Sequence, residues 1–147
     1  VFTYEDLVVL NFSPAGEMLW AKRIPKKQYY KGDGTFQSIE RISKKTEYFS
    51  YLAGMDKENL YIYFNEHPKN LNNPKKLIYL HKVDDAVPLK FSLNLENGEV
   101  KSEIMKDLGQ SSVFFKPMSS FQKEQNADVI IIAQFRKKYK LGTFNFN

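Results

Sequence analysis

The chain has two histidines, and each stands close to carboxylates that can serve acid–base or metal chemistry. His81 precedes Asp84 and Asp85, and a histidine–carboxylate pair is a common acid–base unit. His67 directly follows Glu66, but no third ligand stands at a recognised metal-site spacing. The plainer interpretation puts His81 on a strand surface before a turn, and His67 in a solvated loop. We therefore predict no metal site and no catalytic residue, and we keep a propeller-type hydrolase with a site near His81 and Asp84 as an alternative.

Two oxygen-rich segments invite comparison with calcium loops. Asp33 stands between two glycines, and Asp56 is followed closely by Glu58 and Asn59. A calcium loop needs more carboxylates at fixed spacing, whereas turn formation explains both segments. The sequence has no cysteine, no nucleophile elbow, no phosphate-cradling glycine loop and no zinc-protease helix motif. We therefore predict no cofactor, and the common hydrolase and nucleotide-binding classes are disfavoured.

Two basic turns with tyrosine nearby stand at residues 26–31 and 136–140. Solvated turns and edge protection are the plainer interpretation, and binding of an anionic partner is the alternative. Such runs can hold an anionic glycan or a nucleic acid through phosphate or sulfate contacts and stacking. Exposed tyrosine rings can also form an aromatic platform for a glycan or a peptide, although cross-strand packing on a sheet is the plainer interpretation. The candidate binding residues are Tyr29, Tyr30, Tyr61, Tyr63, Arg136, Lys137 and Lys138. The net charge of +5 helps with an anionic partner without requiring one, and because no nucleic-acid fold signature is present we rank nucleic acid below protein or polysaccharide.

The elements that must position these residues are predicted to be strands. The chain is rich in phenylalanine and tyrosine, it alternates apolar and polar residues over short runs, and it has no long amphipathic helix. Three hairpins stand out: one across Asp6–Lys26 with a turn at residues 13–16, one joining 48–55 to 60–64, and one joining 89–95 to 99–105 through Asn97-Gly98. Further strands are predicted at 35–46, 77–83, 111–115, 128–135 and 141–146. The most apolar of them, residues 128–135, is predicted to be central.

A weak internal repeat runs through the chain. Leu10–Glu17 is similar to Leu93–Glu99, and Glu58–Phe64 is similar to Asn126–Ile132. The repeats span approximately residues 1–76 and 77–147 of a single β domain. A period of roughly 70 to 80 residues exceeds the usual propeller blade of about 40 to 50, and fits a blade with long loops.

The segment Asp6–Ser13, followed by Gly16 and then Trp20, resembles the repeat of bacterial β-propellers of the pyrroloquinoline-quinone-enzyme type. In those repeats a strand ends in a turn glycine, and a tryptophan follows four residues later. The second copy, from Gly98, lacks the tryptophan. The resemblance implies blade-like β-meanders of an uncharacterised exported bacterial family. It implies no cofactor, because the quinone-binding residues have no counterparts here.

These observations predict an all-β fold of antiparallel meanders with propeller-like blades. About ten or eleven strands make fewer than three four-stranded blades, whereas closure needs at least four. An incomplete propeller, a ring of several chains, and a closed barrel or sandwich therefore remain open. The chain starts at Val1 without a methionine or a signal peptide, so we expect a processed product or a piece of a longer chain. We predict a non-catalytic binding or scaffold module, periplasmic or extracellular, without a membrane span and able to form a homo-oligomer.

Overall fold

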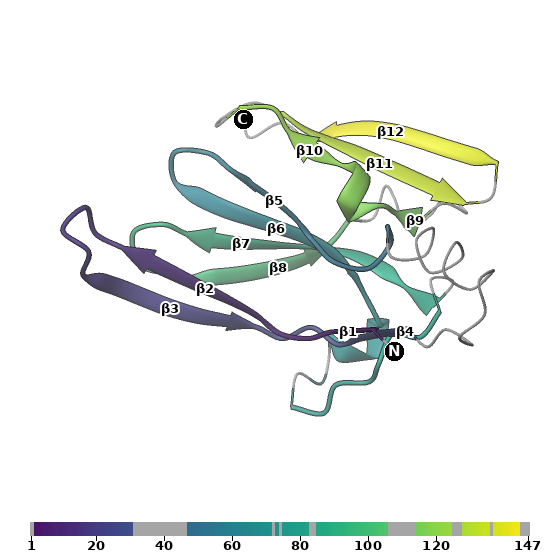
Figure 1. Ribbon diagram of the computed structural model, residues 1–147, viewed down its shortest axis with the longest axis horizontal. Helices are drawn as coiled ribbons and strands as arrows, with labels where there is room; N and C mark the ends of the chain where they lie inside the picture. Colours follow the sequence, from purple (N-terminus) through teal and green to yellow (C-terminus); the bar gives the residue numbers. More distant parts are fainter. Residues whose placement is uncertain are drawn as a thin grey trace.

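The structure, a computed structural model, describes residues 2–30, 47–71, 73, 75–82, 85–105, 114–124, 128–135 and 137–144. Every ladder between named strands is antiparallel, and the described residues contain no α-helix, which confirms the all-β prediction (Figure 1). The strands are β1 (Phe2–Tyr4), β2 (Leu7–Phe12), β3 (Met18–Ile24), β4 (Gln28–Tyr30), β5 (Leu52–Met55), β6 (Asn59–Glu66), β7 (Val87–Asn94), β8 (Val100–Ile104), β9 (Phe114–Phe115), β10 (Phe121–Gln122), β11 (Val129–Phe135) and β12 (Lys138–Phe144). The short 3₁₀ turns η1 (Pro68–Asn70) and η3 (Pro117–Ser119) lie between strands.

The first hairpin forms as predicted. β2 pairs with β3 from Leu7 opposite Ile24 to Phe12 opposite Met18, with a register shift near the turn. The turn closes with a hydrogen bond from the Ser13 amide to the Glu17 carbonyl, and Gly16 takes a φ of +86°. That value is natural for glycine and costly for residues with a Cβ atom. β1 and β4 pair beyond the open end of this hairpin.

The second and third predicted hairpins merge into one four-stranded meander, β5-β6-β7-β8. β6 and β7 form its longest ladder, from Asn59 opposite Asn94 to Glu66 opposite Val87. The Asn97-Gly98 hairpin joins β7 to β8, and Gly98 has a φ of +69°. β6 is buried on both faces, which is unusual for an antiparallel sheet and shows that another layer covers each side.

The last sheet is built around β11. This strand pairs with β12 along one edge and with the short strands β9 and β10 along the other, so the prediction of a central strand here is confirmed. β12 begins three residues earlier than the predicted 141–146 strand.

The prediction of a strand across Leu77–Val83 is wrong for the described residues 77–82, where only Leu80 makes a bridge, parallel to Gln28. The side chain of Asn70 explains the difference. Its Oδ1 accepts from the amide of Ile78 at 2.7 Å and its Nδ2 donates to the carbonyl of the same residue at 2.8 Å. A side chain that takes both backbone groups leaves them unable to join a ladder. The predicted strand at 35–46, and parts of those at 111–115 and 141–146, lie outside the described residues.

Three of the four sheets stack as layers: the β5–β8 sheet lies in the middle, the β2–β3 hairpin on one side of it and the β11 sheet on the other (Figure 1). The first core lies between the hairpin and the middle sheet and contains Ile24, Ile62, Phe64 and Leu93. The second core lies between the middle sheet and the β11 sheet and contains Leu52, Tyr61, Tyr63, Met105, Phe115, Val129, Ile131 and Ala133. No sheet in the described residues closes into a barrel.

Candidate binding surface

A parallel bridge between distant segments creates the most notable surface feature. The amide of Tyr29 donates to the carbonyl of Leu80 at 3.1 Å, and the amide of Leu80 donates to the carbonyl of Lys27 at 2.9 Å. This bridge places β4 beside residues 79–81. Gln28 fixes β4 to the rest of the protein, because its buried side chain donates to the carbonyl of Asn65 and accepts from the amide of Ser50.

Three rings meet where this bridge forms. The ring centroid of Tyr29 lies 5.6 Å from that of Tyr79 and 5.1 Å from that of His81, both edge-to-face. The rings of Tyr79 and His81 are 5.9 Å apart. His81 is exposed and the two tyrosines are half-buried, so part of each ring is open to solvent. We call Tyr29, Tyr79 and His81 the aromatic platform.

Charged side chains frame the aromatic platform on two sides. The Nζ atom of Lys27 lies 4.3 Å from the ring centroid of Tyr79, a cation–π distance. The hydroxyl of Tyr79 donates to the Glu5 carboxylate at 3.3 Å. Partial desolvation and the Glu5 charge raise the pKa of Tyr79, so its hydroxyl stays protonated and able to donate. The platform therefore offers stacking faces, a cation and a carboxylate within one small area.

Two buried charged side chains, Glu66 and Lys26, lie next to this segment. The Glu66 carboxylate is 2% exposed and accepts from the amides of Lys27 at 3.0 Å and His67 at 2.7 Å, and from Asn70 Nδ2 at 2.9 Å. Burial raises the pKa of Glu66, while these donors and Lys26 act against the rise. Burial also lowers the pKa of Lys26 to about 8, opposed by Glu66. The Lys26 ammonium lies 4.9 Å from the ring centroid of Tyr4. These bonds fix the backbone that carries Lys27 and Tyr29.

A cleft of about 170 Å³ opens beside Glu66. Its lining is mostly apolar, with one carboxylate, one amide and one hydroxyl: Pro25, Glu66, Asn70, Leu71, Leu77, Leu89, Phe91 and Ser102. Its volume is below the roughly 300 to 1,000 Å³ typical of ligand pockets. The donors to Glu66 already hold that carboxylate in place, so we assign the cleft no ligand.

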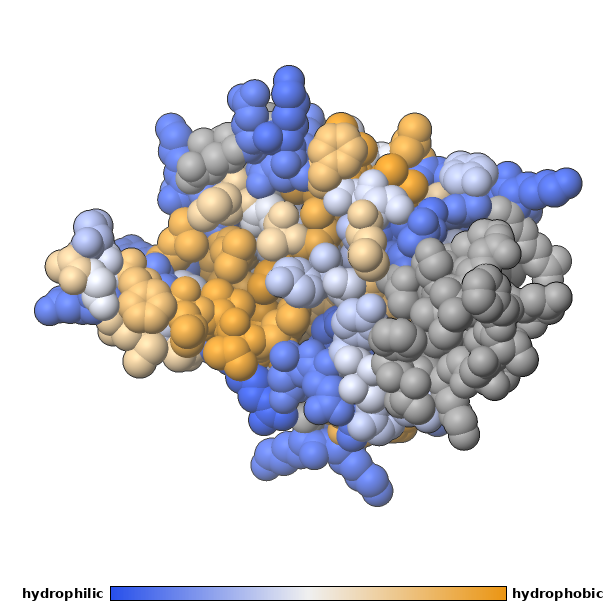
Figure 2. All heavy atoms as spheres, in the orientation of Figure 1, coloured by the Kyte–Doolittle hydropathy of each residue, from blue (hydrophilic) through white to orange (hydrophobic). Residues whose placement is uncertain are grey.

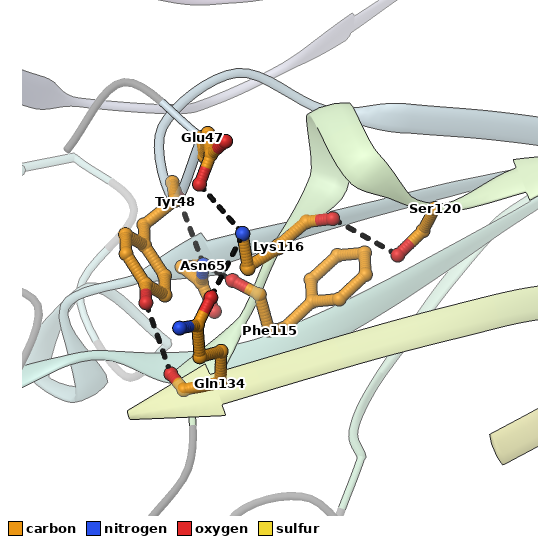
Figure 3. Close-up of polar contacts among 7 residues, drawn as sticks. All are labelled: Glu47, Tyr48, Asn65, Phe115, Lys116, Ser120 and Gln134. Atoms are coloured by element: carbon orange, nitrogen blue, oxygen red, sulfur yellow. Dashed lines mark hydrogen bonds and ion pairs between the residues drawn. The ribbon is translucent and has the colours of Figure 1, made fainter. Parts of the chain in front are cut away.

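A second polar cluster surrounds Lys116 (Figure 3). Its Nζ atom lies 2.6 Å from a Glu47 carboxylate oxygen and donates to the Gln134 side-chain oxygen at 2.9 Å. The Tyr48 hydroxyl donates to the Gln134 carbonyl at 3.1 Å, and burial followed by the Glu47 charge raises the pKa of Tyr48. Asn65 Nδ2 donates to the carbonyls of Tyr48 and Phe115. These contacts join β6, β9 and β11 to the segment before β5, so the cluster is a structural joint.

The predicted binding residues differ in their exposure and in their positions in the structure. Tyr29 lies in the aromatic platform. The prediction that Tyr61 and Tyr63 form an exposed platform is wrong, because they are 9% and 0% exposed between the middle sheet and the β11 sheet. Lys137 and Lys138 are exposed at the β11–β12 turn. Arg136 and the side chain of Tyr30 lie outside the described residues.

Among the residues considered for metal binding or catalysis, His67 and Asp56 form hydrogen bonds that stabilise local turns. His67 caps η1, its Nδ1 accepting from the Lys69 amide at 3.2 Å. Asp56 holds the β5–β6 turn by accepting from the amides of Glu58 and Asn59 and from the Tyr61 hydroxyl. No group of three metal-ligating side chains occurs among the described residues. Asp33 and Asp84 lie outside them.

Sequence reasoning missed Tyr79 and Lys27 as partners of Tyr29. A partial signal was present, because Tyr79 and His81 are two residues apart and an extended segment points such side chains the same way. Nothing in the sequence signals that this segment lies beside β4.

No protein family, no curated protein and no solved structure matches this chain. The described residues contain no helix long and apolar enough to cross a membrane.

Proposed function

We propose that this chain is a non-catalytic binding or scaffold module that contacts a polysaccharide or a protein segment through the aromatic platform. The observation that carries the proposal is the meeting of three partly exposed rings, from segments about fifty positions apart, on a firmly bonded base. Rings of this kind supply a large contact area for little conformational entropy. Lys27 and Glu5 at its border add polar groups that can fix the orientation of a ligand.

The geometry around His81 favours binding over hydrolysis. A catalytic histidine needs an acid and a nucleophile or a metal within reach in a pocket. The ring of His81 instead packs edge-on against Tyr29 at an exposed surface. Asp84, three residues along the chain, lies outside the described residues.

Binding of nucleic acid or an anionic glycan through the basic turns has less support than the platform. That alternative needs residues 22–31 and 136–140 on one continuous face. β4 belongs to the outer layer with the first hairpin, whereas the β11–β12 turn belongs to the opposite outer layer (Figure 1).

Blade-like stacking is the architecture that we propose for the whole protein, in an exported bacterial protein of propeller type. Trp20 supports this view, because its Nε1 donates to the Leu95 carbonyl of the next sheet at 3.1 Å and its ring lies against Gly98. The two glycine-containing hairpins of the weak repeat therefore lie side by side in adjacent layers.

The proposal is tested by measuring retention of the purified chain on immobilised neutral and acidic polysaccharides and on a peptide array. We expect one class to retain it, and Tyr79→Ala to weaken retention at least roughly tenfold, as truncation of an aromatic anchor does. Tyr51→Ala is the matched control, because Tyr51 is 46% exposed and stands outside the platform. Equal losses from both variants, or no retention on any surface, would overturn the proposal.

A further inference from the structure

The outer face of the β2–β3 hairpin is apolar and uncovered. Along β2 the burial alternates, with Leu7 and Val9 turned to the core and Val8 and Leu10 turned outward. Five apolar side chains on this face are at least half exposed: Val8 at 67%, Leu10 at 50%, Phe12 at 52%, Met18 at 60% and Leu19 at 57%. Figure 2 shows an apolar area at the left of the view, where the hairpin lies. A patch of this kind marks an interaction site rather than an ordinary surface.

The opposite end of the stack presents a second apolar sheet face. In β11, Val129, Ile131 and Ala133 point into the core, so Ile130 and Ile132 point outward. The ladder places Leu141 beside Ile132 and Tyr139 beside Gln134 on this outer face. Tyr139 is 67% exposed and Leu141 is 72% exposed, and Phe121, opposite Ile130, is 49% exposed.

We propose that these two faces bind each other in neighbouring copies of the chain, so that the β2–β3 hairpin of one copy packs on the β11–β12 face of the next. Within one copy the hairpin already covers a sheet face in this way, with Leu7, Val9 and Trp20 against Ile62 and Leu93. The contact between copies continues the same stacking of sheet on sheet.

The available area supports a second copy as the occupant. The exposed apolar side chains supply on the order of 500 Å² on each face, hence roughly 1,000 Å² in total, which reaches the minimum for a specific interface before any polar rim is counted. A head-to-tail contact buries the hairpin face of one copy against the β11–β12 face of the next. Pairing of two hairpin faces would instead leave Tyr139 and Leu141 exposed in both copies. On the hairpin face Arg23 stands opposite Val8 and is paired with Asp6, whereas Leu10 and Phe12 are uncharged. Ile132 and Leu141 on the other face are uncharged too, so the contact leaves no central charge unpaired.

A head-to-tail contact has a distinctive behaviour in mixtures. It uses two different faces, so copies join into a ring or a growing chain. Leu10→Glu should block one face and Leu141→Glu the other, each variant being monomeric alone. An equimolar mixture should give a discrete heterodimer, because each variant supplies the intact face that the other lacks.

Sedimentation velocity over a concentration series is the experiment. We expect the unaltered chain to form species larger than a monomer, each single variant to sediment as a monomer with at least a tenfold weaker association, and the mixture to form a dimer. Lys75→Glu, at an exposed loop position, should associate like the unaltered chain. Circular dichroism and Trp20 fluorescence confirm that each variant is folded, since both altered positions are exposed and Trp20 lies on the inner face.

Two results would overturn the inference. If the unaltered chain stays monomeric at the highest concentration, the apolar faces bind something other than a second copy. If Leu141→Glu still dimerises and the mixture adds nothing, the hairpin faces pair with themselves.

Discussion

At the scale of single residues, the buried pair of Lys26 and Glu66 is the least expected feature. Both side chains are almost fully buried, at 1% and 2% exposed. Buried charges cost free energy unless partners compensate them, and here Glu66 has three hydrogen-bond donors while Lys26 has aromatic faces. The hydrogen bond from the Lys27 amide to Glu66 holds the backbone that leads into β4 and the aromatic platform.

Lys26 should make the protein more stable as pH rises from 8 to 10. Its pKa is about 8 in the folded chain and 10.5 for an unperturbed lysine, so in this range the unfolded chain binds more protons and the free energy of unfolding increases with pH. The predicted gain is about 2 to 3 kcal/mol. Urea unfolding should show it in the unaltered chain and in the exposed-site control Lys75→Met, but not in Lys26→Met.

The measurement should stop at pH 10, because the buried tyrosines act in the opposite direction above it. Burial raises the pKa of Tyr61 to about 12 and raises that of Tyr63, so ionisation in the unfolded chain lowers stability there. An equal rise in Lys26→Met would contradict the assignment to Lys26.

At the scale of elements, two hairpins meet through the contact of Trp20 with Gly98. The amide side chain of Asn11 and the indole of Trp20 both donate to the Leu95 carbonyl, at 2.8 Å and 3.1 Å. Gly98 permits the close approach, since a Cβ atom there would lie 2.9 Å from Trp20 Cδ2 and 2.8 Å from Lys22 Cε. Gly98 therefore has two roles: it forms the β7–β8 turn, and it leaves room for the Trp20 ring of the neighbouring hairpin.

Substitution of the two turn glycines separates these roles. Gly16→Ala and Gly98→Ala both place a Cβ atom at a positive φ, but only Gly98→Ala also creates a contact with Trp20, because nothing lies within 4 Å of the Gly16 position. We expect Gly98→Ala to lower the free energy of unfolding by about 1 to 3 kcal/mol more than Gly16→Ala. Urea unfolding followed by Trp20 fluorescence measures both, and equal losses would show that the contact with Trp20 adds nothing.

At the scale of the whole molecule, the middle sheet and the β11 sheet are joined by close packing and by hydrogen bonds of the Asn65 and Gln122 side chains. Gln122 accepts from the Met55 amide at 2.7 Å and donates to the Met55 carbonyl at 2.9 Å, which imitates a strand pairing between the layers. Gly54 lies at the same junction, and a Cβ atom there would lie 2.9 Å from Val129 Cγ2. This junction fixes the spacing of the layers.

Gly54→Ala should therefore loosen the β11 layer. We expect a loss of about 1 to 3 kcal/mol and faster hydrogen exchange in β11, with the exchange of β2 and β3 unchanged. Gly142→Ala is the control, because nothing lies within 4 Å of a Cβ atom there and the change should be close to neutral. If exchange rises evenly in all layers, the junction is not a local hinge between sheets.

The residue pattern predicted the strands and hairpins because these depend on local chemistry. Alternation along β2 and Asn-Gly at residues 97–98 specify a strand and a turn without reference to the rest of the chain. The prediction failed at 77–83, where the side chain of Asn70 takes the backbone groups of Ile78. It also failed for the exposure of Tyr61 and Tyr63, because their alternation suits a surface strand and a doubly covered strand equally well.

The sequence by itself determined the all-β class, the antiparallel hairpins and the turn glycines, since each follows from neighbouring residues. Only the tertiary structure decided which faces are buried, which rings meet at the platform, and where Lys26 and Glu66 lie. These depend on contacts between segments tens of residues apart. Such contacts form through non-directional apolar burial, which leaves no short-range trace in the order of the amino acids.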